Sequence, residues 1–251
     1  MKNIRLEQME RYIIQKDSVS MEDLQAHFDT SMNTVRRDVA LLMKKGTIEK
    51  VYGGVCARKA EQLTPFDART IKHPEAKTLI GRRAAELVED GDTIFLDSGT
   101  TTLHVVQNLA KKQNITIITY NLHAIMAAVP YPNLTIISLP GQLHRKTSSF
   151  TGLETARFLK AYNIKTAFMA ATGLSLSGGV TNASPLEYEL KITAMERSAK
   201  SYLLLDSHKF GQTALMTYAQ LSGFAGVITE AEPAQEYVAS LEEAGTQLIL
   251  A

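Results

Sequence analysis

Residues 31–46 read SMNTVRRDVALLMKKG and carry the most informative local pattern of the chain. Val35, Val39 and Leu42 recur at helical spacing, which predicts one buried face of an amphipathic helix. Ser31 suits the N-cap position because its hydroxyl can accept a backbone N–H at the start of a helix. Gly46 is a natural helix end. The stretch therefore predicts a helix with one apolar side and one polar side.

The polar side of this predicted helix gathers at its first turns. The residues on it or beside it are Asn33, Thr34, Arg36 and Arg37. Asparagine and arginine read base edges in the major groove of DNA, and serine or threonine can hold phosphates. A solvated helix with a charged face has the same composition, and for this helix alone it is the simpler interpretation.

Two further helices are predicted before this one. The first has four apolar residues at helical spacing, namely Leu6, Met9, Tyr12 and Ile13. The second begins at Ser20, where Asp23 three positions on resembles a capping box. Leu24 and Phe28 of that helix face inward. A short turn at residues 29–30 then leads into the third helix, as in a helix–turn–helix.

A glycine-turned hairpin is predicted directly after the third helix. Residues 47–58 read TIEKVYGGVCAR, in which Ile48, Val51 and Val55 surround Gly53-Gly54. Three helices followed by a basic hairpin make a winged helix–turn–helix. Its wing offers three side chains for contact with DNA phosphates: Lys50, Tyr52 and Arg58.

The stretch TVRRDVALLMKKGTIEKVYGGV (residues 34–55) resembles the signature of the DeoR family of bacterial transcription regulators. The arginine pair, the aspartate, the leucine spacing and the Gly-Gly wing carry the resemblance. It implies a DNA-binding domain over residues 1–57 that binds double-stranded operator DNA. The residues expected at the DNA are Ser31, Asn33, Thr34, Arg36, Arg37, Lys50, Tyr52, Gly53, Gly54 and Arg58.

Bulk composition is that of an ordinary globular protein. The 251 residues are 45% hydrophobic and 21% charged, with a net charge of +1. Residues 1–60 carry 11 basic against 8 acidic side chains, which is a weak sign of a nucleic-acid partner. The single Cys56 excludes an internal disulfide framework. No apolar run is long enough to span a bilayer and the N-terminus is too polar for a signal peptide, so we expect a cytoplasmic protein with no membrane partner.

The remainder of the chain predicts an α/β domain over residues 76–251, joined by a polar linker over residues 58–75. Seven short apolar strands are predicted, at residues 93–97, 115–120, 134–139, 166–171, 202–206, 226–229 and 247–251. Amphipathic helices fit between most of them, at residues 76–89, 102–112, 184–200 and 232–244. Near-continuous apolar strands separated by helices indicate a mainly parallel, Rossmann-like sheet covered on both faces.

Polar residues follow several of these strands, at the edge where such sheets bind ligands. The sequence DSGTTT (residues 97–102) ends the first strand and combines a glycine turn with three hydroxyls at a helix start, which suits a phosphate. A threonine-rich helix cap without a ligand explains the pattern equally well. The residues expected at an effector are Asp97, Ser98, Gly99, Thr100, Thr101, Thr102, Asn121, Arg145 and Lys209.

The same loops resemble the effector domain of the DeoR family, which is similar to ribose-phosphate isomerase and to the CoA-transferase-like fold. The matching motifs are Asp97-Ser98-Gly99-Thr100-Thr101 and Ser207-His208-Lys209-Phe210-Gly211. The resemblance implies that the first motif holds a phosphate and that Lys209 contacts the effector. A homo-dimer is expected because one winged domain reads too few bases for a specific operator, and the resemblance also allows a tetramer. The sequence has no Gly-rich dinucleotide fingerprint and no Walker motif, so no cofactor is expected.

The sequence thus predicts a transcription regulator, a repressor of a carbohydrate-catabolism operon controlled by a phosphorylated sugar. One alternative is a sugar-phosphate isomerase or transferase with a DNA-binding appendage, but residues 170–179 hold no carboxylate for a general base. Glu187 and Glu189 on the next helix are interpreted as a solvated face. The other alternative is a DNA-binding module whose second domain only oligomerises. The six histidines lack metal-ligand spacing, which predicts no metal site.

Overall fold

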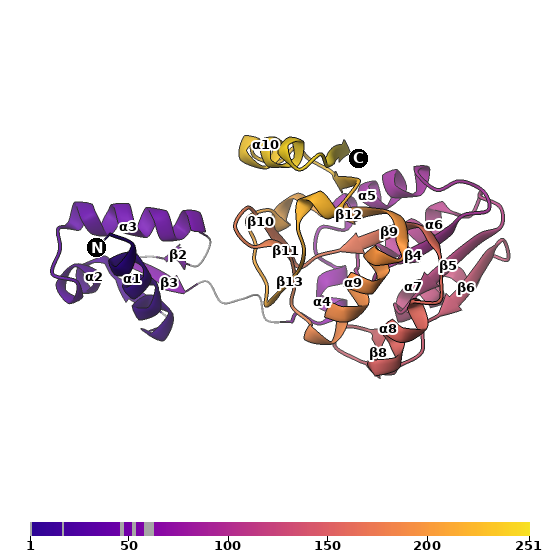
Figure 1. Cartoon of the computed structure of the whole chain (residues 1–251), viewed down its shortest axis with the longest axis horizontal. Coiled ribbons are helices and arrows are strands. Elements are labelled where there is room, and N and C mark those ends of the chain that lie inside the picture. The colour runs from indigo at the N-terminus through magenta and orange to yellow at the C-terminus, as the bar shows by residue number, and fades with distance from the viewer. Residues whose placement is uncertain (1, 17, 46–47, 52–53, 58–62) are drawn as a thin grey trace. The chain divides into compact units, whose positions relative to one another are not determined.

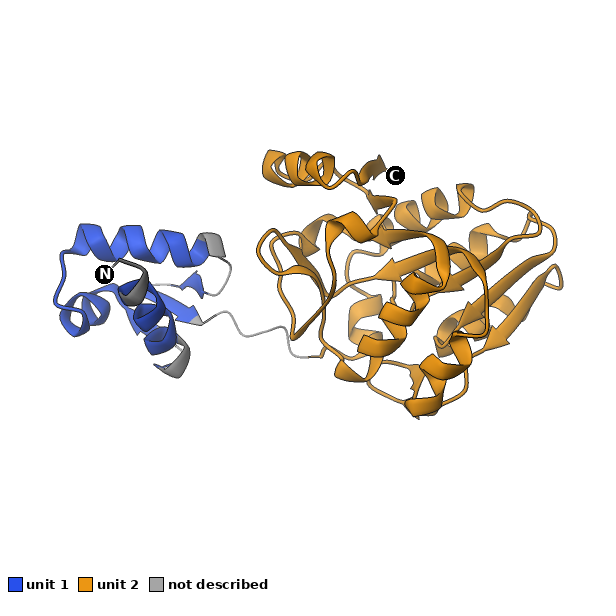
Figure 2. Cartoon of the chain, in the orientation of Figure 1, with its two compact units in different colours: residues 1–60 blue, residues 61–251 orange. Residues whose placement is uncertain are grey.

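The computed structural model describes residues 2–16, 18–45, 48–51, 54–57 and 63–251 (Figure 1). Residues 1–60 and residues 61–251 form two compact units (Figure 2). Each unit has its own buried apolar core. Among the described residues, no helix is both long enough and apolar enough to cross a membrane.

The first unit is a winged helix–turn–helix, as the sequence predicts. Its elements are α1 (Lys2–Lys16), β1 (Ser18–Ser20), α2 (Met21–His27), α3 (Met32–Lys45), β2 (Ile48–Val51) and β3 (Gly54–Ala57). Met9, Leu24 and Val35 from the three helices pack with Ile48 and Val55 from the two wing strands. Burial of this one cluster holds α3 against the wing strands.

Serine side chains cap the N-termini of the second and third helices, as the sequence predicts. The Ser20 Oγ accepts the backbone N–H of Asp23 at 3.0 Å. The Ser31 Oγ accepts the backbone N–H of Thr34 at 3.3 Å. Each bond satisfies a donor that has no partner within its own helix. Between these helices Asp29 takes a left-handed conformation with φ of 43°, which makes the turn tight.

The wing contains a strand that the sequence pattern does not reveal. β1 pairs antiparallel with β3, so that the hairpin becomes a three-stranded sheet of order β1-β3-β2. A Cβ atom on Gly54 would lie 2.3 Å from the carbonyl oxygen of Val19. Glycine at position 54 is therefore required by the close approach of the two strands. Three residues are too few to show an alternating pattern, which is why β1 was not predicted.

The second unit is built on a seven-stranded sheet in which every pairing is parallel. Its strands are β4 (Thr93–Leu96), β5 (Ile115–Thr119), β6 (Leu134–Ser138), β9 (Ile164–Ala170), β12 (Ser198–Leu204), β14 (Gly226–Thr229) and β15 (Gln247–Leu250). Their order across the sheet is β15-β14-β12-β9-β4-β5-β6. All seven predicted strands are confirmed, and the α/β fold class with them.

Helices cover both faces of this sheet and bury two separate clusters (Figure 1). One cluster packs under α5 (Pro74–Glu86), α6 (Leu103–Asn108) and α7 (Leu122–Ala128). The other packs under α8 (Leu153–Leu159), α9 (Tyr188–Glu196) and α10 (Gln235–Glu243). The strands are buried on both sides, which explains their nearly uninterrupted apolar sequences.

Several short elements differ from the prediction. The segment expected as a linker contains α4 (Phe66–Thr70), and α5 begins within it at Pro74. The helix expected over residues 184–200 is η1 (Pro185–Glu187) followed by α9, and β12 begins already at Ser198. Two small sheets were missed, one of β7 (Gln142–His144) with β8 (Ser149–Thr151) and one of β10 (Gly173–Ser175), β11 (Gly179–Asn182) and β13 (Met216–Ala219). Their strands are three or four residues long and lack periodicity. Two further single turns, η2 (Ser207–Lys209) and η3 (Leu221–Gly223), complete the described elements.

Candidate DNA-binding surface and effector site

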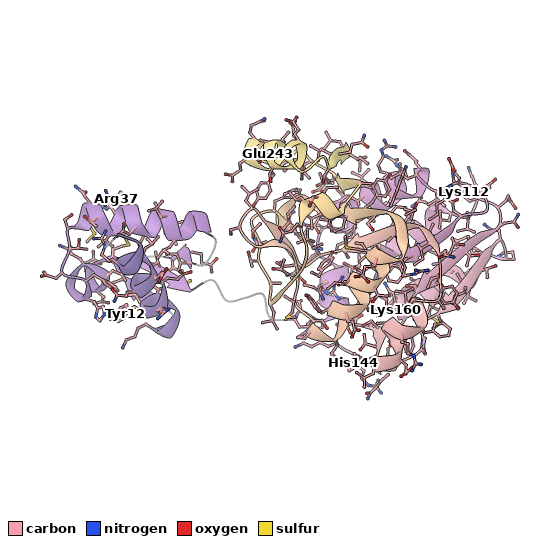
Figure 3. The ribbon with its side chains drawn as sticks, viewed as in Figure 1. Tyr12, Arg37, Lys112, His144, Lys160 and Glu243 are labelled. Atoms are coloured by element: carbon pink, nitrogen blue, oxygen red, sulfur yellow. The ribbon has the colours of Figure 1, made fainter. Side chains whose placement is uncertain are left out.

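The first turns of α3 present a continuous polar surface in the first unit. Ser31, Asn33, Arg36 and Arg37 are exposed, and Thr34 is partly buried. Figure 3 shows Arg37 on the outer side of this helix. A polar surface on the second helix of a helix–turn–helix has the geometry needed to enter a major groove.

A groove of about 470 Å³ separates α3 from the wing. Arg36 lines it from the helix and Lys50 lines it from β2, while Val39 and Val55 contribute apolar surface. Two cations beside one groove suit the path of a phosphate backbone. Gly54 also lines the groove, and three further residues expected at the DNA, Tyr52, Gly53 and Arg58, lie outside the described residues.

Asp38 of α3 forms an ion pair with α1 in the first unit. Its side chain is buried, unlike those of the neighbouring Arg36 and Arg37. Arg5 of α1 donates to the Asp38 Oδ2 from Nε at 2.8 Å and from Nη2 at 2.7 Å. The Arg37 Nε lies 3.9 Å from the Asp38 Oδ1. The carboxylate therefore links α1 to α3 directly beneath the candidate DNA surface.

In the second unit the loop over residues 97–102 follows β4 and is buried throughout. Within the described part of the chain, the backbone N–H groups of Thr100, Thr101 and Thr102 have no hydrogen-bond acceptor. The Thr101 Oγ1 is also buried and lacks a partner there. Buried donors are normally paired, so several unpaired ones together have the character of an anion site.

Asp97 is held entirely by protein groups. Its carboxylate accepts the backbone N–H of Ser98 at 2.8 Å and that of Ala170 at 2.8 Å. It also accepts the Tyr120 hydroxyl and forms an ion pair with Lys191 of α9. Burial, reinforced by the negative charge of Asp97, raises the pKa of Tyr120 well above its ordinary value. Tyr120 therefore remains a proton donor, and Asp97 joins β4, β5, β9 and α9.

Glu187 lies in the same buried site, so its interpretation as part of a solvated face is wrong. It is only 4% exposed. The Glu187 Oε1 accepts the hydroxyls of Ser98 at 2.6 Å and of Ser149 at 2.9 Å. The Asn182 Nδ2 donates to Oε2 at 3.1 Å. The sequence pattern does not reveal this carboxylate, because the two serines that donate to it lie 89 and 38 residues away along the chain.

Asn121 has a capping role in the structure. Its Oδ1 accepts the backbone N–H groups of His123 at 3.0 Å and Ala124 at 3.3 Å, which begins α7. Its Nδ2 donates to the carbonyl of Gly99 at 3.3 Å. Asn121 thus supports the loop over residues 97–102 from the neighbouring strand.

Lys209 lies at the same edge of the sheet. Its Nζ donates to the carbonyl of Ala171 at 2.9 Å and lies 3.6 Å from the Asp206 carboxylate. Ala171 directly follows β9, whose last residue donates to Asp97. Arg145 is exposed between β7 and β8 and, among the residues described, makes no hydrogen bond or ion pair with the other expected effector residues. The fold thus brings Lys209 near the loop and leaves Arg145 at the rim.

Comparison with known proteins places both units in one family. Residues 5–61 match the model of the DeoR-like helix-turn-helix domain, and residues 72–231 match that of the DeoR C terminal sensor domain. The HTH-type transcriptional regulator IolR of Bacillus subtilis (strain 168) is 43% identical over 237 residues, which cover 94% of each protein. The glycerol-3-phosphate regulon repressor of Escherichia coli (strain K12) is 28% identical, again over 94% of each. A solved ribose 5-phosphate isomerase A from Methanocaldococcus jannaschii aligns with a TM-score of 0.41 and 18% identity over 55% of each chain.

Proposed function

The chain belongs to the DeoR family of DNA-binding transcriptional regulators, and we propose that it represses a carbohydrate-catabolism operon and releases its operator when a phosphorylated sugar binds the second unit. Regulators of this family include the glycerol-3-phosphate regulon repressor and a lactose phosphotransferase system repressor. In the proposal α3 and the wing contact the operator, and the loop over residues 97–102 holds the phosphate.

One observation carries the phosphate assignment. The N–H groups of Thr100, Thr101 and Thr102 and the Thr101 hydroxyl are buried donors without an acceptor among the described residues. A phosphate offers several strong acceptor oxygens, and hydrogen bonds to an ionised acceptor are about twice as strong as neutral ones. Lys209 supplies a positive charge at the same sheet edge. The phosphate would thus satisfy groups that the folded protein leaves unpaired.

The sugar hydroxyls have a matching partner in Glu187. Its carboxylate already accepts hydroxyl groups, those of Ser98 and Ser149, in a site that excludes water. A sugar hydroxyl that replaced either serine would meet the same geometry. We therefore extend the proposed effector site beyond the expected residues to Glu187 and Ser149.

Two loops beside this site contact α4, which lies near the start of the second unit. The Phe66 N–H donates to the carbonyl of Lys146 at 2.9 Å, and the Phe66 ring stacks on His123 at 4.3 Å. His123 lies at the start of α7, next to the capping residue Asn121. A ligand that moved either loop would displace α4, which gives effector binding a physical route toward the DNA-binding unit. Such coupling typically amounts to about 1–3 kcal/mol.

Operator binding is proposed to need at least a dimer. One winged domain reads too few base pairs for a specific site, whereas a dimer reads two half-sites separated by about one helical turn. Sedimentation of the full chain with and without an operator fragment measures the stoichiometry. A strictly monomeric protein that binds its operator specifically would contradict this part.

The central test is the variant Lys209→Ala. We expect operator affinity to stay within about twofold of the parent, while release by the sugar phosphate is lost, because the effect of the ligand requires differential binding. Lys200→Ala is the matched control, since Lys200 is an exposed lysine on β12, the strand that precedes the Lys209 loop. Gel-shift titrations against a panel of sugar phosphates report both properties. A Lys209→Ala protein that responds like the parent would place the effector elsewhere.

An enzymatic function is the second candidate, and the buried Glu187 favours it. The sequence has no carboxylate directly after the fourth strand, but the fold brings Glu187 to the strand ends from η1. Isomerisation of a sugar phosphate needs a positioned general base. Incubation of the full chain with pentose and hexose phosphates, followed by product analysis, separates the two. Turnover that is lost in Glu187→Gln would support an enzyme, and ligand binding without turnover would support the regulator.

A further inference from the structure

Two histidines and an aspartate meet at the C-terminal edge of the sheet. His73 lies at the start of α5, while Asp206 and His208 follow β12. One nitrogen or oxygen atom from each lies within 4.8 Å of the other two. The two imidazole rings stack with centroids 3.6 Å apart. Both histidines are exposed and Asp206 is buried, so the cluster is anchored at its carboxylate and open at its imidazoles.

The backbone at His73 is unusual in a way that bears on this cluster. His73 is in the left-handed region, with φ of 50°, and precedes Pro74, the first residue of α5. As the residue before the helix it makes no side-chain capping hydrogen bond. Left-handed conformations cost energy in residues other than glycine and tend to occur at functional sites. The His73 imidazole stacks on that of His208.

We propose that His73, Asp206 and His208 form a binding site for a divalent transition metal ion of the zinc class. Neutral imidazoles and a carboxylate are preferred ligands of such ions, and three protein ligands leave one tetrahedral position for water. Bonds of about 2.0–2.2 Å place tetrahedral ligand atoms roughly 3.3–3.5 Å apart, closer than 4.8 Å. Binding one ion requires the two exposed imidazoles to turn out of their mutual stack, because each ring nitrogen binds a metal in the plane of its own ring.

The charges around the cluster set its expected strength. Lys209 lies 3.6 Å from Asp206, and the charges of Asp206 and Lys209 both act on Lys77. These ammonium groups oppose a bound cation, so the site is expected to bind its ion weakly and reversibly. A bound ion would fasten the start of α5 to the loop that carries Lys209. The site does not depend on the proposed effector, and metal alone tests it.

The full chain is first freed of metal by a chelator and dialysed. Titration calorimetry with Zn²⁺ then measures the affinity and the stoichiometry of binding. We expect one ion per chain. His73→Gln and His208→Gln should each weaken binding at least about tenfold, since even groups behind a metal ligand contribute that much. Both side chains are exposed, so the variants are expected to fold, which circular dichroism verifies.

His144→Gln is the matched control, because His144 is an accessible histidine of β7 and does not belong to the cluster. A Cys56→Ser background removes the single thiol as a competing ligand. Cobalt gives a second measurement, since its visible absorption should report tetrahedral binding in the parent and not in the His73→Gln variant. Equal Zn²⁺ affinity in the parent and both cluster variants, or no saturable binding in the parent, would overturn the proposal.

Discussion

The two units place their polar groups in opposite ways. In the first unit the candidate DNA contacts of α3 are exposed and lie within one stretch of sequence, as Arg36 and Arg37 illustrate. In the second unit most candidate effector groups are buried, and Ser98, Ser149 and Glu187 come from three separate segments. A large partner such as DNA comes to an exposed surface, whereas a small ligand must be enclosed. The difference follows from the size of what each unit is proposed to bind.

Two buried ion pairs, Lys191 with Asp97 in the second unit and Arg5 with Asp38 in the first, differ in the exposure of their cations. Lys191 and Asp97 have side-chain exposures of 2% and 0%, whereas Arg5 and Asp38 have 31% and 1%. A buried charge that loses its partner keeps its full desolvation cost, while water near the partner reduces that cost. The comparison therefore predicts a larger loss in the second unit.

Lys191→Ala is expected to have the largest effect on stability. It leaves the Asp97 carboxylate buried without its cation and removes the bond from Lys191 to the Ala170 carbonyl. Breaking a buried pair on one side costs about 3–5 kcal/mol of unfolding free energy. Denaturant unfolding of the variant against Lys200→Ala, which alters an exposed lysine, measures it. A loss below about 1 kcal/mol would mean that water reaches Asp97.

Arg5→Ala applies the same test to the first unit. Asp38 loses both hydrogen bonds that join α1 to α3, and hydrogen bonds to charged groups contribute about 1.5–3 kcal/mol. The partly exposed site lets water replace the guanidinium, so the loss should be smaller than for Lys191→Ala. Arg11→Ala is the control, because Arg11 is an exposed arginine on the same helix. Equal losses in the Arg5 and Lys191 variants would contradict the role of exposure.

The sequence predicted the first unit far better than the buried site of the second. Val35, Val39 and Leu42 define α3 by local spacing alone, and the capping roles of Ser20 and Ser31 are equally local. The strands of the large sheet were also predictable, because burial on both faces makes each one continuously apolar. Local patterns were sufficient wherever neighbours in sequence are neighbours in space.

The buried network was not predictable for the opposite reason. Glu187 lies in η1, where a solvated acid is the ordinary expectation, and only its contacts with Ser98 and Ser149 show otherwise. Lys191 sits four positions later on α9 and has the same helical surroundings as a surface lysine. No spacing rule relates these residues to β4. The crossover connections of the sheet bring these residues next to their partners. A pattern along the chain does not reveal the order of the strands.

For the first unit, the next prediction concerns DNA binding and not stability. Arg36→Ala should leave stability within about 0.5 kcal/mol, because Arg36 is exposed, and should weaken operator binding by about 1–3 kcal/mol if it contacts a base. A phosphate contact would instead reduce the salt dependence of binding. Gel shifts at two salt concentrations distinguish the two contacts, with Arg11→Ala as the control because Arg11 is an exposed arginine of α1. Unchanged affinity for both Arg36→Ala and Arg37→Ala would contradict the assignment of α3 to DNA.

The smallest expected effect on stability belongs to Thr101→Val. The Thr101 hydroxyl is buried and has no partner among the described residues, so exchanging it for a methyl group removes no hydrogen bond. The change should be neutral or slightly stabilising, within about 0.5 kcal/mol. Inorganic phosphate serves as the probe for the loop over residues 97–102. Its affinity should fall about tenfold, because a hydrogen bond to a charged acceptor contributes about 1.5 kcal/mol.

Thr102→Val provides the matched comparison one residue away. The Thr102 hydroxyl already bonds to the carbonyls of Asp97 at 2.7 Å and Gly99 at 2.9 Å, so the same substitution should cost about 1 kcal/mol of stability. The Thr102 hydroxyl therefore supports the loop, whereas the Thr101 hydroxyl is proposed to bind the phosphate. The two variants thus distinguish an effect on folding from an effect on ligand binding. Thermal unfolding and phosphate titration of both variants measure the two effects. If Thr101→Val loses as much stability as Thr102→Val and binds phosphate like the parent, the Thr101 hydroxyl serves the fold and the phosphate assignment fails.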